Sequence, residues 1–551
     1  MPAGLAQPLT PTQRPWRRIA LALGALLLLN GLLSFSTWWP TPAILPDARI
    51  APEFVLLWLA MLALVAWRGS LGGILLGVLT LVYMLLVLGR YADVTAPAIF
   101  GREIRFYWDG PQIPRFLWVW AQDKPWWLVL GAATVLIGCF AGLYGMLRAL
   151  IRTAAREAVP YALRARWTWV LSVGATVLII ANYAGVRATW PVVSKPVIPV
   201  FWHQAGLLVA SLSEEAKARL LPAQSAVEAA IARGPSQALA GLAGRDVYLI
   251  MLESIGAVTY DDPRAHRTLA PVRERFKADL EEAGLQVVSG FFRSPTFGGG
   301  SDLAQLGVLA GMDLSNPTAH DVLLTTQRPT LVSLFRQAGY QSFGFYPGLR
   351  WEWPERSFYD FEVFLENRDL GYQGPKLGYW EIPDQYAAAR FEQLHPRKAG
   401  SRPRFVFFPL ITCHLPFSPP PPYQPDWARV LSPEPYDAAE VARALAEKPH
   451  WTDMFPDYLR MVQYTYQWLG PWLGRAQPRE TVFVLAGDHQ PVAGVTGQGA
   501  SWDVPVHVVS RDPQLLARFI AQGFAPGMAP PRRSLGRLDQ LTGMMLEAFG
   551  P

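Results

Sequence analysis

Polar residues stand directly after three apolar runs of the chain, where each could take part in chemistry. Glu253 ends the run DVYLIMLE, His414 follows RFVFFPLITC, and Asp488 with His489 ends TVFVLAGDH. Runs of this length and composition are typical of strands that are buried on both faces of a sheet. Active sites of open, mainly parallel sheets gather at the carboxyl ends of the strands. We therefore expect these four side chains to meet in one cleft.

A serine follows three glycines in the stretch TFGGGSDLAQLGVLAG, residues 296–311. A serine before an apolar-periodic run is typical of a helix N-cap, so we expect Ser301 to cap a helix. The amino terminus of a helix binds phosphate and sulfate oxygens through free N–H groups and the helix dipole. The glycines would let the backbone come close to such a group, where a Cβ would intrude. Ser301 is therefore a candidate nucleophile, whereas Asp302 supplies only a favourable first-turn charge.

The residue types point to one divalent metal ion. Two carboxylates and an imidazole form a ligand set suited to Zn²⁺ or Mn²⁺, and a metal at the Ser301 oxygen would activate it for attack. The chain has only two cysteines, Cys139 and Cys413, so a thiolate site is excluded. Taken singly, each residue also fits a simpler interpretation as a cap, a turn residue or a satisfied histidine. Their joint occurrence at strand ends favours the metal site.

The first part of the chain predicts a membrane region. Of 551 residues, 51% are hydrophobic and 17% are charged, which is too apolar for one ordinary soluble enzyme of this length. A bilayer core needs about 20 apolar residues, and five segments come close to or exceed this length. They are residues 19–38, 51–67, 71–90, 126–147 and 168–188. The first segment is too long for a cleaved signal peptide and lacks its small-residue ending.

Basic residues beside these segments predict the orientation. Arg14, Arg17 and Arg18 precede the first segment, and Lys and Arg prefer the cytoplasmic side. Basic residues in the loop 91–124 oppose this rule, but the reverse topology would place the basic N-terminal flank outside. Five spans then put the chain after about residue 190 outside the cytoplasm. The net charge of +6 is partly this topology signal, and we expect no nucleic-acid partner.

The sequence divides into three parts. Residues 1–190 form the five-helix transmembrane region, and residues 191–244 read as an extended stretch, an amphipathic helix and a linker. In residues 245–551, apolar strands alternate with helices. This alternation predicts an α/β domain with a mainly parallel sheet sandwiched by helices.

Four motifs of the outer domain resemble those of the alkaline phosphatase and sulfatase superfamily. Within it, the chain is most similar to the group of lipoteichoic acid synthases and phosphoglycerol transferases, which typically have five spans before an extracytoplasmic catalytic domain. The motifs are IMLES (250–254), GGGSDLAQLGVLAG (298–311), CHLPF (413–417) and GDHQP (487–491).

The resemblance implies a role for each matching residue. Glu253, Asp488 and His489 would be metal ligands, and His414 would contact the substrate. Ser301 would also touch the metal and would take the place of the family's usual threonine nucleophile, losing only a methyl group that restricts the rotamer.

A further family motif, Trp-Asn-Arg, grips the donor headgroup and corresponds here to RWEWPERSFYDF, residues 350–361. Arg356 is the better match for the phosphate-binding arginine, and Trp353 is a looser match. Arginine suits this task because its planar fork can pair two phosphate oxygens. The divergence of this stretch leaves the donor headgroup open.

The resemblance implies a metal-dependent phosphotransferase in the cytoplasmic membrane, with its catalytic domain in the periplasm or extracellular space. It would move a phospholipid headgroup, in the first place phosphoglycerol from phosphatidylglycerol, through a phospho-serine to a glycan or lipid acceptor. The cofactor would be one Mn²⁺ or Zn²⁺ ion, with Mg²⁺ as an alternative.

Three rival hypotheses remain. A phosphoethanolamine transferase would share the site, but such enzymes usually add ligands for a second zinc and several disulfides, and two cysteines argue against these. A sulfatase needs a C/S-x-P-x-R motif, which SDLAQ lacks. From another class, the chain could be a membrane-bound lipid or glycan sensor that keeps the fold without turnover.

Overall fold

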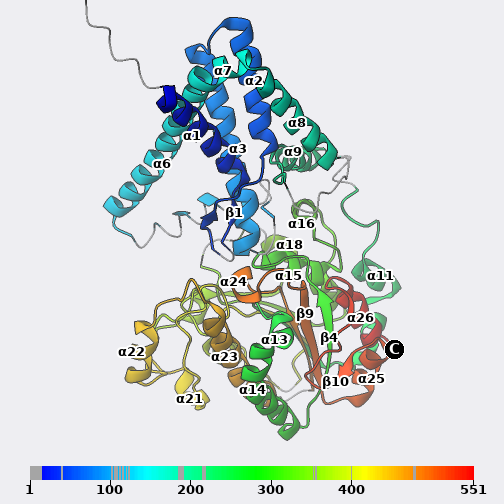
Figure 1. Cartoon of the computed structure of the whole chain (residues 1–551). Helices are drawn as coiled ribbons and strands as arrows, with labels where there is room; N and C mark the ends of the chain where they lie inside the picture. The colour runs from blue at the N-terminus through cyan, green and yellow to red at the C-terminus, as the bar shows by residue number, and fades with distance from the viewer. Residues whose placement is uncertain are drawn as a thin grey trace, which may run out of the picture. The chain divides into compact units, whose positions relative to one another are not determined.

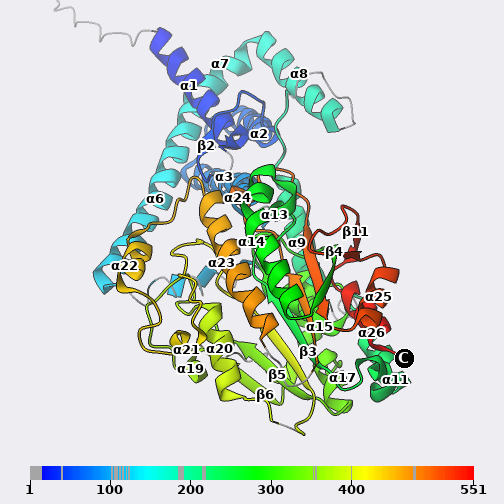
Figure 2. The ribbon, with the colours of Figure 1, turned by 90° about the horizontal axis from the view of Figure 1, so that it is seen from below.

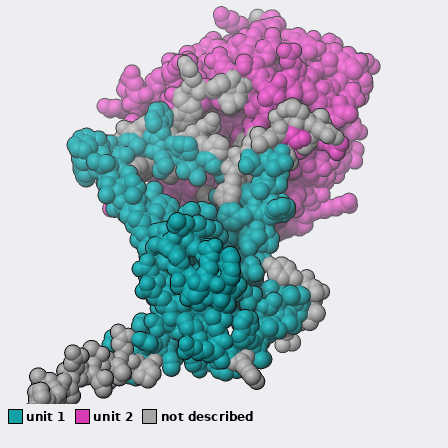
Figure 3. All heavy atoms as spheres, turned by 90° about the horizontal axis from the view of Figure 1, so that it is seen from above, with its two compact units in different colours: residues 1–97, 103–209 teal, residues 98–102, 210–551 magenta. Residues whose placement is uncertain are grey.

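In the computed structural model the chain forms two compact units (Figure 3). Unit 1 comprises residues 1–97 and 103–209, and unit 2 comprises residues 98–102 and 210–551. The structure describes residues 15–551 except 39–40, 101–102, 105–108, 111–112, 115–116, 119–120, 122–123, 184–191, 214–218, 351–352, 354–355, 399 and 476–479.

Unit 1 is helical in all five of the apolar segments. The helices are α1 (Pro15–Ser34), α2 (Pro52–Arg68), α3 (Gly73–Phe100), α6 (Trp126–Thr153) and α8 (Arg166–Tyr183). Three stretches of the described residues are long and apolar enough to cross a membrane, namely Trp16–Ser34, Gly73–Ile99 and Trp126–Arg164. Unit 1 is thus a membrane region by the length and composition of its helices. The helix α2 has 17 residues and the apolar part of α8 is also shorter, so five spans stay a prediction.

Residues 191–244 differ from the expected secondary structure. The extended stretch expected at the start of this segment ends at Ile198, where the helix α9 (Ile198–Leu212) begins. The prediction was wrong here because Pro191, Pro196 and Pro199 read as extended backbone. Proline fits the first turn of a helix, where its missing N–H is not needed, and Pro199 is the second residue of α9.

Unit 2 is built on a nine-stranded sheet with the order β10-β4-β9-β8-β3-β7-β5-β6, and β11 pairs with β4. Adjacent strands are parallel throughout the series β8-β3-β7-β5-β6. The strand β9 is antiparallel to both of its neighbours, β8 and β4. The strands are β3 (Asp246–Leu252), β4 (Gln286–Arg293), β5 (Gln341–Tyr346), β6 (Val363–Glu366), β7 (Arg404–Pro409), β8 (Thr481–Gly487), β9 (Asp503–Ser510), β10 (Ala525–Pro526) and β11 (Ser534–Arg537). The expected α/β domain with a mainly parallel sheet is therefore confirmed.

Two hydrophobic cores lie on opposite faces of this sheet. Along β3, Tyr248, Ile250 and Leu252 enter one core, while Val247, Leu249 and Met251 enter the other, as the alternation of a strand requires. The first core is covered by α14 (Pro263–Glu282), α20 (Asp384–Leu394) and α23 (Phe455–Gly474). The second is covered by α15 (Ser301–Ala310), α17 (Leu331–Gln337), α25 (Pro513–Ala521) and α26 (Gln540–Phe549). Both faces of β3 are buried, which explains its continuous apolar run.

The helices α14 and α23 lie side by side over the first core (Figures 1 and 2). Their close approach depends on Gly470 of α23. A Cβ at this position would lie 2.8 Å from Asp279 Oδ2 and 3.0 Å from Phe276 Cδ2 of α14. A larger side chain would therefore push the two helices apart.

We predict that Gly470→Val lowers the free energy of unfolding by about 1–3 kcal/mol, because overpacking of a helix contact costs this much. Thermal unfolding of the purified full-length protein measures the effect as a lower midpoint temperature. Gln467→Val is the matched control, since Gln467 is exposed on the same helix. Equal midpoints for the two variants would contradict the close contact.

Candidate active site

Parallel pairing of β3 and β8 brings two carboxylates to one point. Leu252 lies opposite Gly487 in the register, so Glu253 and Asp488 leave the sheet side by side. Glu253 is 7% exposed and Asp488 is 1% exposed. Gly487 permits this approach, because a Cβ there would collide with the carbonyl oxygen of Ile255. Two buried carboxylates are thus held together by the sheet itself.

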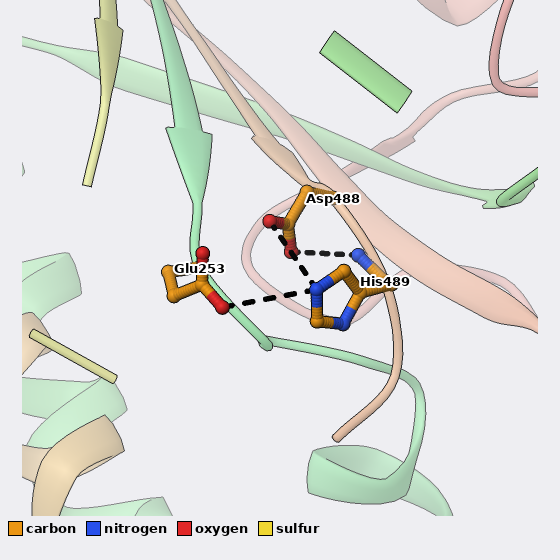
Figure 4. A group of neighbouring side chains, drawn as sticks. All are labelled: Glu253, Asp488 and His489. Carbon is orange, nitrogen blue, oxygen red and sulfur yellow. Dashed lines mark hydrogen bonds and ion pairs between the residues drawn. The ribbon is translucent and has the colours of Figure 1, made fainter. Parts of the chain in front are cut away.

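An imidazole completes the group. Glu253, Asp488 and His489 offer ligand atoms that all lie within 4.8 Å of one another. Both carboxylates face the His489 ring (Figure 4), whose Nε2 lies 3.7 Å from Glu253 Oε1 and 3.7 Å from Asp488 Oδ2. The other nitrogen, Nδ1, lies 2.7 Å from the carbonyl oxygen of Gln490. A carbonyl only accepts, so Nδ1 carries a hydrogen, and Nε2 is the ring nitrogen that faces the carboxylates.

The hydrogen bonds of the carboxylates leave room for a cation. Asp488 Oδ1 accepts from the backbone N–H groups of Ser254 at 2.8 Å and His489 at 2.7 Å. Asp488 Oδ2 is buried without a hydrogen-bond partner among the described residues. Burial and the charge of Asp488 raise the pKa of Glu253 well above its usual range. An unpaired buried oxygen and two repelling carboxylates are features that a divalent cation would satisfy, so the donor set fits a metal ion.

Ser254 holds this arrangement through an unusual backbone conformation. Its φ is +56°, in the left-handed region that residues other than glycine rarely adopt. In this conformation its N–H donates to Asp488 while its hydroxyl donates to Glu253 Oε1 at 2.9 Å. Residues held in such a conformation cluster at functional sites.

Ser301 lies beside Glu253 and His489. Its Oγ lies 3.1 Å from His489 Nε2 and 3.4 Å from Glu253 Oε2. The expected N-cap role of Ser301 was wrong, because Gly300 is the N-cap and no side chain caps α15. All three glycines before Ser301 have positive φ angles, of 65°, 137° and 76°. The glycines turn the chain so that the serine hydroxyl points to the carboxylates and not to its own helix.

His414 lies beyond the end of β7 (Arg404–Pro409). Its ring stacks on Tyr379 at 4.4 Å and meets the ring of Trp380 edge-on at 5.6 Å. Burial lowers the pKa of His414 to about 4, so the ring is neutral at neutral pH. Nδ1 lies 2.7 Å from the carbonyl oxygen of Leu415 and must donate to it, which leaves Nε2 as an acceptor.

A buried carboxylate fixes the segment that leads to His414. Asp384, the first residue of α20, accepts from the N–H groups of Ile411 at 3.0 Å and Thr412 at 2.8 Å. Burial raises the pKa of Asp384 to about 6. These bonds set the path of the chain just before His414.

The two residues expected to grip the headgroup make other contacts. Arg356 is exposed at the start of α18 (Arg356–Tyr359), and its guanidinium lies 4.4 Å from the ring centroid of Phe364. The ring of Trp353 packs on Tyr346 and Tyr359, both at 5.0 Å. Among the described residues, no hydrogen bond or ion pair joins Arg356 or Trp353 to the four residues of the cluster. Their headgroup roles stay predictions.

A second arginine of the same stretch, Arg350, was not predicted as a site residue. Arg350 donates to the carbonyl oxygen of Trp380 and lies 3.3 Å from Glu381 in an ion pair. Through Trp380 and Tyr379 it belongs to the surroundings of His414. Its place in RWEWPER after β5 was the available signal, because every parallel strand of this sheet ends at the same edge.

Comparison with known proteins gives one family match. Residues 287–507 match the Sulfatase family model. No curated protein matches the sequence.

Three solved structures are similar to part of the chain. The lipoteichoic acid synthase LtaP from Listeria monocytogenes is 14% identical over 50% of this chain and 67% of its own, with a TM-score of 0.34. The phosphoglycerol transferase GacH from Streptococcus pyogenes, in complex with sn-glycerol-1-phosphate, is 12% identical over 59% and 91%, with a TM-score of 0.33. The periplasmic domain of EcEptC from Escherichia coli, in complex with Zn, is 13% identical over 55% and 80%, with a TM-score of 0.35. The match of residues 287–507 to the Sulfatase family model agrees with the predicted resemblance, and the motifs at 298–311, 413–417 and 487–491 lie within it.

Proposed function

We propose that the chain is a membrane-anchored, metal-dependent phosphotransferase that moves a phospholipid headgroup to a glycan or lipid acceptor. The observation that carries the proposal is the position of Ser301 Oγ, 3.1 Å from His489 Nε2 and 3.4 Å from Glu253 Oε2. A hydroxyl held between metal-type ligands at a helix amino terminus is placed to attack a tetrahedral phosphorus. A non-catalytic sensor would not need its hydroxyl in this position.

The chain's own residues supply most of the site. Glu253, Asp488 and His489 would hold one Mn²⁺ or Zn²⁺ ion, with Mg²⁺ as an alternative. When bound, such an ion lowers the pKa of a coordinated hydroxyl and offsets negative charge on phosphoryl oxygens. The amino terminus of α15 adds the positive end of its dipole on the same side.

The reaction has two transfers at phosphorus. Ser301 Oγ loses its proton and forms a bond to the headgroup phosphorus, while the bond to the diacylglycerol oxygen breaks and that oxygen takes a proton. An acceptor hydroxyl then attacks the same phosphorus and gives up its proton. The bond to Ser301 breaks, and the serine hydroxyl is regenerated.

We propose that His414 positions the headgroup. Because Nδ1 of His414 is engaged by Leu415, its neutral Nε2 accepts a hydrogen bond and does not donate one to phosphate. A glycerol hydroxyl or an ethanolamine ammonium could supply that hydrogen. We place phosphoglycerol from phosphatidylglycerol first and phosphoethanolamine second, because the chain has two cysteines and its described residues contain a single cluster of metal-type ligands.

The membrane region gives the proposal a physical basis. The donor lies in the bilayer, so anchoring the catalytic domain raises its effective concentration near the donor. We propose that this domain lies outside the cytoplasmic membrane, in agreement with the basic flank before the first segment.

We predict that Ser301→Ala lowers diacylglycerol release from labelled phosphatidylglycerol by at least about 100-fold, because the nucleophile is gone. The assay uses the full-length protein with Mn²⁺ or Zn²⁺, and a parallel arm with phosphatidylethanolamine identifies the headgroup. Ser301→Thr is the matched control, since it keeps the hydroxyl and should retain activity. Unchanged release in Ser301→Ala would rule out the mechanism.

Metal loading tests the ligand set separately. Glu253→Gln and Asp488→Asn should each reduce metal bound to the purified protein at least about tenfold, because each removes a charged ligand. Asp302→Asn is the control, since Asp302 lies in the same helix turn as Ser301 but outside the cluster. Titration with Zn²⁺ or Mn²⁺ followed by elemental analysis gives the measurement, and equal loading of all three variants would exclude this site.

Two arginines compete for the headgroup phosphate. The family motif assigns the binding of this phosphate to Arg356, whereas the contacts around His414 favour Arg350. We predict that Arg350→Ala raises the KM for the lipid about tenfold and lowers kcat less, because a charge-assisted bond to phosphate contributes about 1.5–3 kcal/mol. Arg356→Ala is the comparison, and a larger KM effect there would return the role to Arg356.

A further inference from the structure

The helix α9, labelled in Figure 1, has the sequence IPVFWHQAGLLVASL, which is apolar but too short to cross a membrane. Its 15 residues extend about 22 Å at 1.5 Å per residue, whereas the hydrocarbon core is about 30 Å thick. A position other than across the membrane must explain why α9 is so apolar. The contacts of α9 within unit 1 show where it begins, which side is packed and which side is open.

The amino terminus of α9 is bound by a buried glutamate of α2. Glu53 is 3% exposed, and its Oε1 accepts from the N–H groups of Val197 at 2.6 Å and Ile198 at 3.0 Å. These N–H groups have no partner within the helix, and the negative charge also matches the positive end of the helix dipole. The start of α9 is therefore fixed beside the start of α2.

A buried arginine fixes the same end to two other helices. Arg90 of α3 donates to the carbonyl oxygen of Phe35, just after α1, at 2.8 Å and to that of Lys195, just before α9, at 3.2 Å. Lys195 also pairs with Asp93 at 2.8 Å. Arg90 lies 17 residues after Gly73, or about 26 Å along α3. The start of α9 thus lies near one edge of the membrane region, on the side where α1 ends and α2 begins.

One side of α9 packs on its own unit. A Cβ at Gly89 of α3 would lie 2.5 Å from the ring of Phe201, so this glycine makes room for the ring. Gln204, one turn on, is buried and donates to the carbonyl oxygen of Ile104 at 3.0 Å. Val197, Phe201 and Gln204 therefore define the packed side.

Another side of α9 carries an open apolar stripe. Ile198 is 46%, Trp202 is 81% and Val209 is 67% exposed in the whole chain. With the exposed Ala205, their spacing of four, three and four residues places them on one line along the helix. His203, the residue after Trp202, is exposed about 100° further round, away from both the stripe and the packed side.

We propose that α9 lies along the surface of the bilayer, with Ile198, Trp202, Ala205 and Val209 inserted into lipid and His203 facing water. Unit 1 contains the membrane-crossing helices, and Glu53 and Arg90 fix the start of α9 beside the end of α1, the start of α2 and the second half of α3. An apolar stripe exposed beside these helices is covered by lipid. Tryptophan suits the depth of the headgroups, because its ring is apolar and its N–H is polar. The inference concerns unit 1 and does not depend on the proposed phosphotransfer.

The test measures lipid contact along α9 in the full-length protein. A bimane probe is attached to Trp202→Cys, Ile198→Cys or His203→Cys in a Cys139→Ala background, since Cys413 is buried. Each protein is placed as one copy per nanodisc of phosphatidylglycerol and phosphatidylethanolamine. Quenching is compared for lipids with a doxyl group at carbon 5, lipids with a doxyl group at carbon 12, and iodide in water.

We expect the probes at positions 198 and 202 to be quenched at least twofold more by the carbon-5 lipid than by the carbon-12 lipid, with little effect of iodide. The probe at position 203 is the matched control and should respond mainly to iodide. Equal iodide quenching at positions 202 and 203 would overturn the proposal. Shielding from iodide that appears only with two copies per disc would assign the stripe to a second copy of the chain and would also overturn it.

Discussion

The site depends on one constraint, which is that two carboxylates leave adjacent parallel strands at the same level and are buried there. The register of β3 and β8 sets Glu253 beside Asp488, and the apolar faces of both strands prevent the pair from moving into water. Two buried charges of the same sign repel each other strongly, so the pair needs a cation or a proton. The neighbouring features serve this pair: Ser254 donates to both carboxylates, and His489 directs its Nε2 toward them.

The glycine stretch and the end of β7 bring the remaining groups to this point. Gly298, Gly299 and Gly300 turn the chain in the left-handed region, so that Ser301 enters the cluster as the first residue of α15. Asp384 holds the backbone before His414, and the stacked ring of Tyr379 limits the orientation of that imidazole. Ser301, the three candidate metal ligands and His414 thus come from separate segments that meet at one edge of the sheet.

Much of this could be predicted from the sequence, because buried parallel strands are continuous apolar runs and their ends carry the chemistry. The runs before Glu253, His414 and Asp488 located three strands, and the five apolar segments located five helices. The N-cap role of Ser301 could not be decided from residue types, since it depends on the φ angles of the glycines before it. The helix α9 was missed because the prolines before and at its start favour extended backbone. Glu53, which stabilises its start, is 144 residues away in the sequence. Arg350 was missed for a similar reason, since its link to His414 passes through the distant Trp380.

The central claim is that Ser301 carries the headgroup between donor and acceptor. It is tested most directly by mixing the full-length protein, metal ion and phosphatidylglycerol without acceptor, stopping the reaction with acid, and sequencing the peptides by mass spectrometry. The proposed mechanism predicts phosphoglycerol on Ser301 in an amount that matches the first burst of diacylglycerol. Release of diacylglycerol with an unmodified Ser301, or with the group on another residue, would contradict it.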